Sequence, residues 1–310
     1  MRPFESAQNQ TNRHAPSLGR RKLLTGAASL AAFAAMTPGQ QALAAEKEDT
    51  LPRGAGGIKQ SVVHWCFNPM GVEELARGAA TLGLKSVELV PPSAWPTLKE
   101  QGLICAISSS HGFAKGFAHT EEHEECLTKL RDSIDATSAA GFPSVITFSG
   151  MRRGIDNDTG LKNMVDGLKK IVGHAEQKKV TICLEMLNSR VNVEMKGHPD
   201  YMCDTIEWAV EVCKRIGSPR MKILFDIYHV QIMQGDIIAR IKQYHEYIGH
   251  YHTAGVPGRN EIDGSQEVNY APIMKAIAET GYQGYVGQEF IPVREDKLAS
   301  LAEAVRICDV

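Results

Sequence analysis

The chain has 310 residues, of which 43% are hydrophobic and 23% are charged, and its formal net charge is −2. This composition excludes a fibrous chain and a chain that is disordered throughout. The near-neutral charge disfavours binding to nucleic acid through a basic surface. The length suits either two domains or one barrel of alternating strands and helices.

The first residues have the order of an export signal. An arginine pair at 20–21 precedes an alanine-rich apolar stretch at 23–36, and a small-residue cleavage site follows at 42–44. The arginine pair is typical of the twin-arginine route; an ordinary export signal or an N-terminal anchor is the alternative. We therefore predict a twin-arginine signal peptide over residues 1–44, export to the periplasm with no membrane attachment after processing, and a linker over residues 45–57.

Residues 58–310 alternate short apolar runs with helical patterns. Most runs are continuously apolar, which is typical of strands that are covered on both faces. The predicted strands are 61–67, 85–90, 103–108, 144–149, 180–185, 221–226, 248–253 and 285–290. The predicted helices are 127–140, 161–175, 202–216, 236–248, 270–280 and 295–308.

Strands that alternate with helices indicate parallel strands joined by right-handed crossovers. Eight such units in one chain predict an α/β fold, a single-domain (β/α)8 TIM barrel. A doubly wound open sheet is the alternative, and no GxGxxG follows the first strand to support its dinucleotide-binding form. The seven cysteines contain no CxxC pair, so neither a zinc knuckle nor a thioredoxin motif is indicated, and their pairing stays open.

The last four predicted strands all end in side chains that can bind a metal. These are Glu185, Asp226, His252 and Glu289. In a parallel barrel the carboxyl ends of the strands meet at one face. Three carboxylates and one imidazole suit Mn²⁺ or Mg²⁺ best, with Co²⁺ or Zn²⁺ also compatible. The alternative is that each residue ends its strand only because strand ends meet water.

Four segments resemble hydroxypyruvate isomerase and its relatives among the xylose-isomerase-like barrels, which include the ketose 3-epimerases. They are LEMLN (184–188), DIYHVQIMQGD (226–236), HTAGVPGRNEID (252–263) and GQEF (287–290). The resemblance covers residues 58–308. It implies one divalent cation held by the four strand-end residues, with Glu185 and Glu289 as the proton-transfer pair of an enediolate reaction. The segment at 188–201 departs from the family pattern, which leaves the substrate open.

The resemblance also implies substrate contacts from His229 and Arg259. An arginine in the turn after the seventh strand could fork onto a substrate carboxylate, and a histidine at a helix start could bind a substrate oxygen or only cap the helix. We predict that His111, which follows the third strand, lines the pocket too. Other candidates for the pocket are His64, Trp65, Glu88, Asn188 and His198, and Glu88 could instead be a structural partner inside the barrel mouth.

The predicted function is therefore a metal-dependent isomerase of a small α-hydroxycarbonyl compound, with hydroxypyruvate to tartronate semialdehyde as the specific reaction. A ketose or keto-sugar 3-epimerase is the main alternative. A non-catalytic sugar-binding barrel would not need both glutamates. An apurinic endonuclease of the same barrel family would need more histidine ligands and a basic groove. The expected partners are a small-molecule substrate and other copies of the chain, and not nucleic acid.

Overall fold

The computed structural model describes residues 57–310. The predicted signal peptide, and all but the last residue of the predicted linker, lie outside the described residues, so the predicted export stays a prediction. Within the part that is described, no helix combines the length and the apolar character that crossing a membrane requires.

Residues 57–310 form a parallel barrel. Its strands are β1 (Lys59–Val63), β2 (Ser86–Glu88), β3 (Ile107–Ser108), β4 (Ser144–Thr147), β5 (Thr181–Glu185), β6 (Met221–Asp226), β7 (Ile248–Thr253) and β8 (Tyr285–Gln288). The eight-stranded sheet has the order β2-β1-β8-β7-β6-β5-β4-β3, and every pair is parallel. The two ends of this order approach each other, because Val87 N donates to Ile104 O at 3.1 Å and Leu89 N to Ile107 O at 3.2 Å. The sheet is thus a nearly closed TIM barrel, and the open-sheet alternative is wrong.

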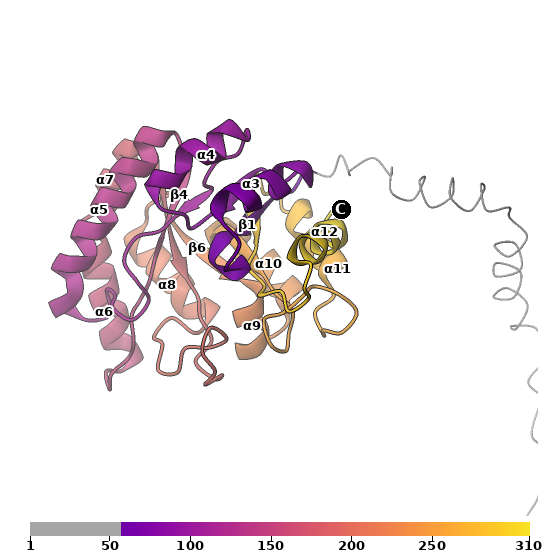
Figure 1. The fold of residues 1–310 in the computed structure, drawn as a ribbon. Helices are drawn as coiled ribbons and strands as arrows, with labels where there is room; N and C mark the ends of the chain where they lie inside the picture. The colour runs from indigo at the N-terminus through magenta and orange to yellow at the C-terminus, as the bar shows by residue number, and fades with distance from the viewer. Residues whose placement is uncertain (1–56) are drawn as a thin grey trace, which may run out of the picture. The chain divides into compact units, whose positions relative to one another are not determined.

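The helices lie outside the strands (Figure 1). They are α3 (Val72–Thr81), α4 (Trp95–Glu100), α5 (His123–Ala140), α6 (Asn157–Leu168), α7 (Val172–Lys178), α8 (Ile206–Ile216), α9 (Ile227–Met233), α10 (Ile237–Tyr244), α11 (Tyr270–Glu279) and α12 (Lys297–Ile307). Gly141 and Gly217 end α5 and α8 at φ values of 77° and 73°, a left-handed conformation that costs glycine little.

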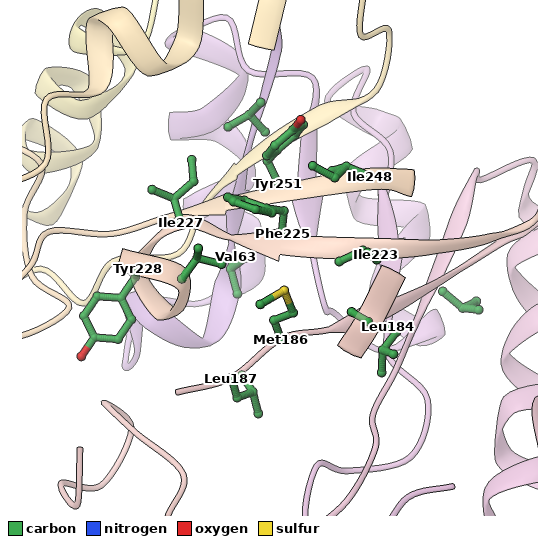
Figure 2. Packing of buried hydrophobic residues seen from close by; sticks show 14 of the residues in the cluster. Val63, Leu184, Met186, Leu187, Ile223, Phe225, Ile227, Tyr228, Ile248 and Tyr251 are labelled. Atoms are coloured by element: carbon green, nitrogen blue, oxygen red, sulfur yellow. The ribbon is translucent and has the colours of Figure 1, made fainter. Parts of the chain in front are cut away.

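Alternation along each strand separates two layers of the core. Ile223 and Phe225 of β6 and Tyr251 of β7 belong to the large hydrophobic cluster, and Figure 2 shows their side chains. Leu224, which lies between Ile223 and Phe225 in β6, belongs to a small separate cluster with Ile107, Ile146 and Cys183. That cluster fills the barrel interior, because neighbouring residues of a strand point to opposite faces.

The predicted elements differ from the structure in several places. None of the predicted helix ranges covers α3, α4 or α9. The first strand was predicted to end at residue 67 but ends at Val63, and residues His64–Phe67 form a 3₁₀ turn. The third strand is reduced to two residues, although the chain before it still pairs with β2. The predicted helix at 161–175 is two helices, α6 and α7, and glycines at 167 and 173 flank the break, where they weaken helix formation. All seven cysteines are buried and free.

Candidate active site

The four strand-end residues come together at the carboxyl end of the barrel. Glu185 ends β5, Asp226 ends β6, His252 lies near the end of β7, and Glu289 directly follows β8. Two of them lie two residues beyond interior side chains, Glu185 after Cys183 and Asp226 after Leu224, so the strand alternation directs them inward. Each offers a ligand atom, and these atoms all lie within 4.8 Å of one another.

The arrangement of donor atoms fits a divalent cation. His252 Nδ1 lies 3.0 Å from Glu289 Oε2 and 3.7 Å from Glu185 Oε1. His252 Nδ1 and Asp226 Oδ2 are both buried and make no hydrogen bond. A buried polar atom without a partner is costly, and a cation among three carboxylates and an imidazole would remove that cost. The donor set matches hard or borderline ions; the identity of the ion stays a prediction.

The start of α9 determines which Asp226 oxygen faces the cluster. Asp226 is the N-cap of this helix, and its Oδ1 accepts the backbone N–H of His229 at 3.2 Å. An N-cap acid satisfies one of the free N–H groups of the first turn. The sequence Asp-Ile-Tyr-His therefore uses one oxygen to begin the helix and leaves Oδ2 for the site.

The electrostatics of the cluster show an excess of negative charge. Burial, with the charge of Glu289 added, raises the pKa of Glu185 and raises that of Asp226 well above its ordinary value. Burial also acts to raise the pKa of Glu289, but Arg259 and His252 outweigh it and hold that pKa well below its usual range. Carboxylates packed this closely resist ionising together, so the site favours an added positive charge.

Arg259 joins the cluster from the loop after β7. Its Nη2 lies 2.6 Å from Glu289 Oε2 and 3.6 Å from Asp226 Oδ2, and the side chain is 4% exposed. The backbone at Arg259 has a φ of 58°, a left-handed conformation that is uncommon for arginine. Nε is buried without a hydrogen bond. Nη2 of Arg259 therefore contacts the carboxylates, and Nε stays available as a donor.

Aromatic rings and a loop carbonyl fix the Arg259 guanidinium in place. It lies over the rings of Trp65 and Tyr228, with centroid distances of 5.1 and 5.5 Å. Its Nη1 donates to Met195 O at 2.9 Å, and Tyr228 Oη donates to Lys196 O at 2.8 Å. These bonds hold the segment after β5, which departs from the family pattern, against the site. The sequence placed Trp65 among the candidates for the pocket but gave no sign that it stacks on Arg259.

His229 presents a neutral N–H donor to the site. Its Nδ1 accepts the backbone N–H of Asn188 at 3.0 Å, which assigns the ring proton to Nε2. Nε2 is buried, makes no hydrogen bond and lies 3.6 Å from Asp226 Oδ2. Burial, followed by the charge of Arg259, lowers the pKa of His229 well below its ordinary value. Asn188, a candidate for substrate contact, thus orients His229.

His111 and His64 use their ring nitrogens in bonds to nearby chain segments. His111 Nε2 lies 2.9 Å from Thr147 Oγ1, and its Nδ1 lies 3.2 Å from Lys115 O. His64 Nε2 lies 3.0 Å from Met70 O. His111 is buried, and burial lowers its pKa. Its predicted part in substrate binding stays a prediction.

Glu88 connects the cluster to the first half of the barrel. Its Oε2 lies 3.0 Å from His250 Nε2 and 3.0 Å from His252 Nε2, and its Oε1 accepts the hydroxyl of Ser61. Burial acts to raise the pKa of Glu88, but the two histidines outweigh it and lower it to about 2. Of the two predicted roles for Glu88, the structure confirms that of a structural partner. The alternating histidines of residues 250 and 252 were the only sequence sign of this network.

The model of one family, the xylose isomerase-like TIM barrel, matches residues 77–308. Among curated proteins, the chain is similar to a putative hydroxypyruvate isomerase of Mus musculus, with 28% identity over 80% of this chain and 84% of that protein. It is also similar to a 2-oxo-tetronate isomerase of Pectobacterium atrosepticum, with 27% identity over 70% of this chain and 85% of that protein.

Among solved structures, an AP endonuclease, family 2, from Brucella melitensis superimposes with a TM-score of 0.69 and 25% identity, over 79% of this chain and 98% of that one. The 3-keto-D-glucoside 4-epimerase of E. coli superimposes with a TM-score of 0.68 and 20% identity, over 81% and 100%. These likenesses agree with the barrel described above.

Proposed function

The chain belongs to the xylose isomerase-like TIM barrel family and is an isomerase, and we propose that it interconverts small α-hydroxycarbonyl compounds through an enediolate, with hydroxypyruvate and tartronate semialdehyde as the first pair to test. The observation that carries the proposal is the pair of buried glutamates, Glu185 and Glu289. They reach one point from β5 and from the end of β8, with two strands between them.

Two carboxylates at one substrate permit proton transfer in both directions. One glutamate takes the proton from the carbon that bears the hydroxyl group, and the electron pair of that C–H bond forms the enediolate double bond. The other glutamate gives a proton to the former carbonyl carbon. The hydroxyl proton passes to the former carbonyl oxygen, so the carbonyl group ends on the carbon that lost its hydrogen. Each positioned acid or base contributes about 10²–10⁴ in rate. A divalent cation held by Glu185, Asp226, His252 and Glu289 would polarise the substrate oxygens and stabilise the developing negative charge.

Arg259 and His229 supply the remaining polar contacts. Arg259 has an unused buried Nε, and a guanidinium binds a carboxylate or a hydroxyl pair well. The neutral His229 ring directs its free Nε2–H into the same space, where it can donate to a substrate oxygen. Both donors are pre-positioned by contacts outside the substrate space, which limits the entropy lost on binding.

The same two glutamates would also serve a ketose or keto-sugar 3-epimerase, in which the second proton returns to the opposite face of the same carbon. An endonuclease would need further histidine ligands. Among the described residues, the groups able to hold an ion are the four residues above and Glu88-His250-His252, which share His252. A binding module would leave the pair of buried glutamates without a purpose.

Turnover in D₂O tests the proposal. The protein is loaded with Mn²⁺, supplied with hydroxypyruvate, 2-oxo-tetronate and a set of ketoses, and followed by NMR. We expect one substrate to acquire deuterium at the carbon next to the carbonyl. A carbonyl group that has moved to the neighbouring carbon identifies an isomerase. A carbonyl group that stays in place beside a carbon of inverted configuration identifies an epimerase. Product without deuterium, or no exchange with any substrate, would contradict the enediolate proposal.

A further inference from the structure

We propose that Glu88 is a positioning residue for the metal centre: it accepts the Nε2–H of His252 and thereby presents the Nδ1 lone pair of that ring to the ion. This inference rests on the proposed function, because it concerns the same cation. On this proposal, β2 contributes none of the four ligands, but its residue Glu88 controls how tightly they bind the ion.

Strand register brings Glu88 to His252 across half the barrel. Residue pairing runs from His252 to Gly287, from Gly287 to Ser61 and from Ser61 to Ser86, a single row across β7, β8, β1 and β2. Glu88 lies two residues beyond Ser86 on the same face, so its side chain extends back over this row. The resulting distance from Glu88 Oε2 to His252 Nε2 is 3.0 Å, and both side chains are fully buried.

Gly287 makes room for this contact. A Cβ at this position would lie 2.8 Å from Glu88 Oε2, 2.8 Å from His252 Cδ2 and 3.2 Å from His252 Nε2. Any larger residue would therefore push the carboxylate and the ring apart. The backbone at Gly287 has no positive φ that would itself require glycine, so the close approach of Glu88 and His252 is the physical reason for a glycine here.

The two nitrogens of His252 then have separate tasks. Nε2 is committed to Glu88, and Nδ1 lies 3.0 Å from Glu289 Oε2 without a hydrogen bond. A carboxylate behind a ligating histidine fixes its tautomer, orients its ring and raises its basicity, and losing such a partner typically costs 10- to 100-fold in metal affinity. Ser61 and His250 hold the carboxylate from its other sides.

Mn²⁺ titration of the full protein, followed by EPR of the free ion, tests this role in three variants. Glu88→Gln keeps the volume but removes the charge, and Gly287→Ala keeps every side chain but separates the pair. His250→Gln is the matched control, because it changes a different partner of Glu88 and leaves the residues of the Glu88–His252 contact unchanged. We expect one ion per chain in all proteins, 10- to 100-fold weaker binding in Glu88→Gln and Gly287→Ala, and a dissociation constant within about threefold of the parent in His250→Gln.

The outcomes separate the two proposals. If the parent binds no Mn²⁺, the proposed function fails. If the parent binds Mn²⁺ and Glu88→Gln binds it equally well, only the positioning role fails. Equal weakening in His250→Gln would also overturn it, because the whole buried network would then be responsible. Two ions in the parent and one in Glu88→Gln would make Glu88 a ligand of a second ion and contradict the role. Circular dichroism spectra and melting temperatures confirm that each variant is folded.

Discussion

The two halves of the barrel treat their buried polar atoms differently. In the first half, the buried side chains of His111 and Glu88 have hydrogen-bond partners within the protein. In the second half, Asp226 Oδ2, His229 Nε2, His252 Nδ1 and Arg259 Nε have none, and these are four of the seven such atoms among the described residues. Buried polar groups are normally paired, so four unpaired atoms at and after the ends of β6 and β7 support the proposal that a ligand binds there. On the proposed function, the second half of the barrel binds the ligand and the first half supports it.

Removing a glutamate of the second half gives the largest expected effect. Glu185→Gln and Glu289→Gln should each lower kcat by about 10²–10⁴, because the amide cannot exchange the proton. Glu261→Gln is the matched control: Glu261 is also buried, but its carboxylate accepts the N–H groups of Val293 and Arg294 at 2.8 and 3.0 Å.

The control should lose stability, about 1–3 kcal/mol for the disturbed buried bonds, and keep its kcat. Steady-state kinetics and chemical unfolding measure the two quantities. If both active-site variants retain parental turnover while folded, the assignment of the proton-transfer pair is wrong.

The Arg259→Lys variant tests whether the guanidinium group of Arg259 contributes to substrate binding. A lysine keeps the charge but loses the planar contacts with Trp65 and Tyr228 and the two-sided approach to Glu289 and Asp226. We expect kcat/KM to fall about 10- to 100-fold, in proportion to a charge-assisted hydrogen bond of about 1.5–3 kcal/mol. Arg240→Lys, at the ion pair with Glu207 on the surface, should change kcat/KM less than twofold. Equal kinetics in both variants would remove Arg259 from substrate binding.

A pair of histidine variants tests whether the two halves of the barrel differ in substrate binding. His229→Gln should lower kcat/KM about tenfold, since it removes the N–H donor that faces the site. His111→Gln should leave kcat/KM near the parent value and lower the melting temperature, because both nitrogens of His111 bond to the protein itself. If His111→Gln loses activity while its stability is unchanged, His111 binds substrate as the sequence predicted, and the first half does more than support.

The smallest expected effect is a pH dependence at the segment after β5. The ring of His198 lies against that of Phe113, with centroids 4.4 Å apart, and near Tyr201, His229, Arg259 and Glu289. Burial, followed by Arg259, lowers the pKa of His198 to about 4. As the pH falls, the unfolded chain therefore takes up the His198 proton at a higher pH than the folded chain does. The contribution of neutral His198 to the free energy of unfolding is fully present above about pH 6.5 and is lost as the pH falls toward 4.

His198→Phe removes that loss. The melting temperature of the variant relative to the parent should therefore be higher at pH 5 than at pH 7. A difference that does not change with pH would show that His198 titrates normally.

The ends of the fifth, sixth and seventh strands were predictable from the sequence because they depend on local patterns. Apolar runs that stop at Glu185, Asp226 and Glu289 predicted both the barrel and the shared site. Contacts that cross the barrel were not predictable, since they depend on register and on close approach. Glu88 meets His252 across 164 positions of sequence, and only the closed sheet with a glycine at 287 shows it.

Anomalous scattering from crystals grown with Mn²⁺ would show whether the four strand-end residues hold one ion. We expect one strong peak per chain, bonded to Glu185, Asp226, Glu289 and the Nδ1 atom of His252. A peak on the far side of that ring, between Glu88, His250 and His252 Nε2, would contradict this expectation, as would no peak in a crystal whose protein is active.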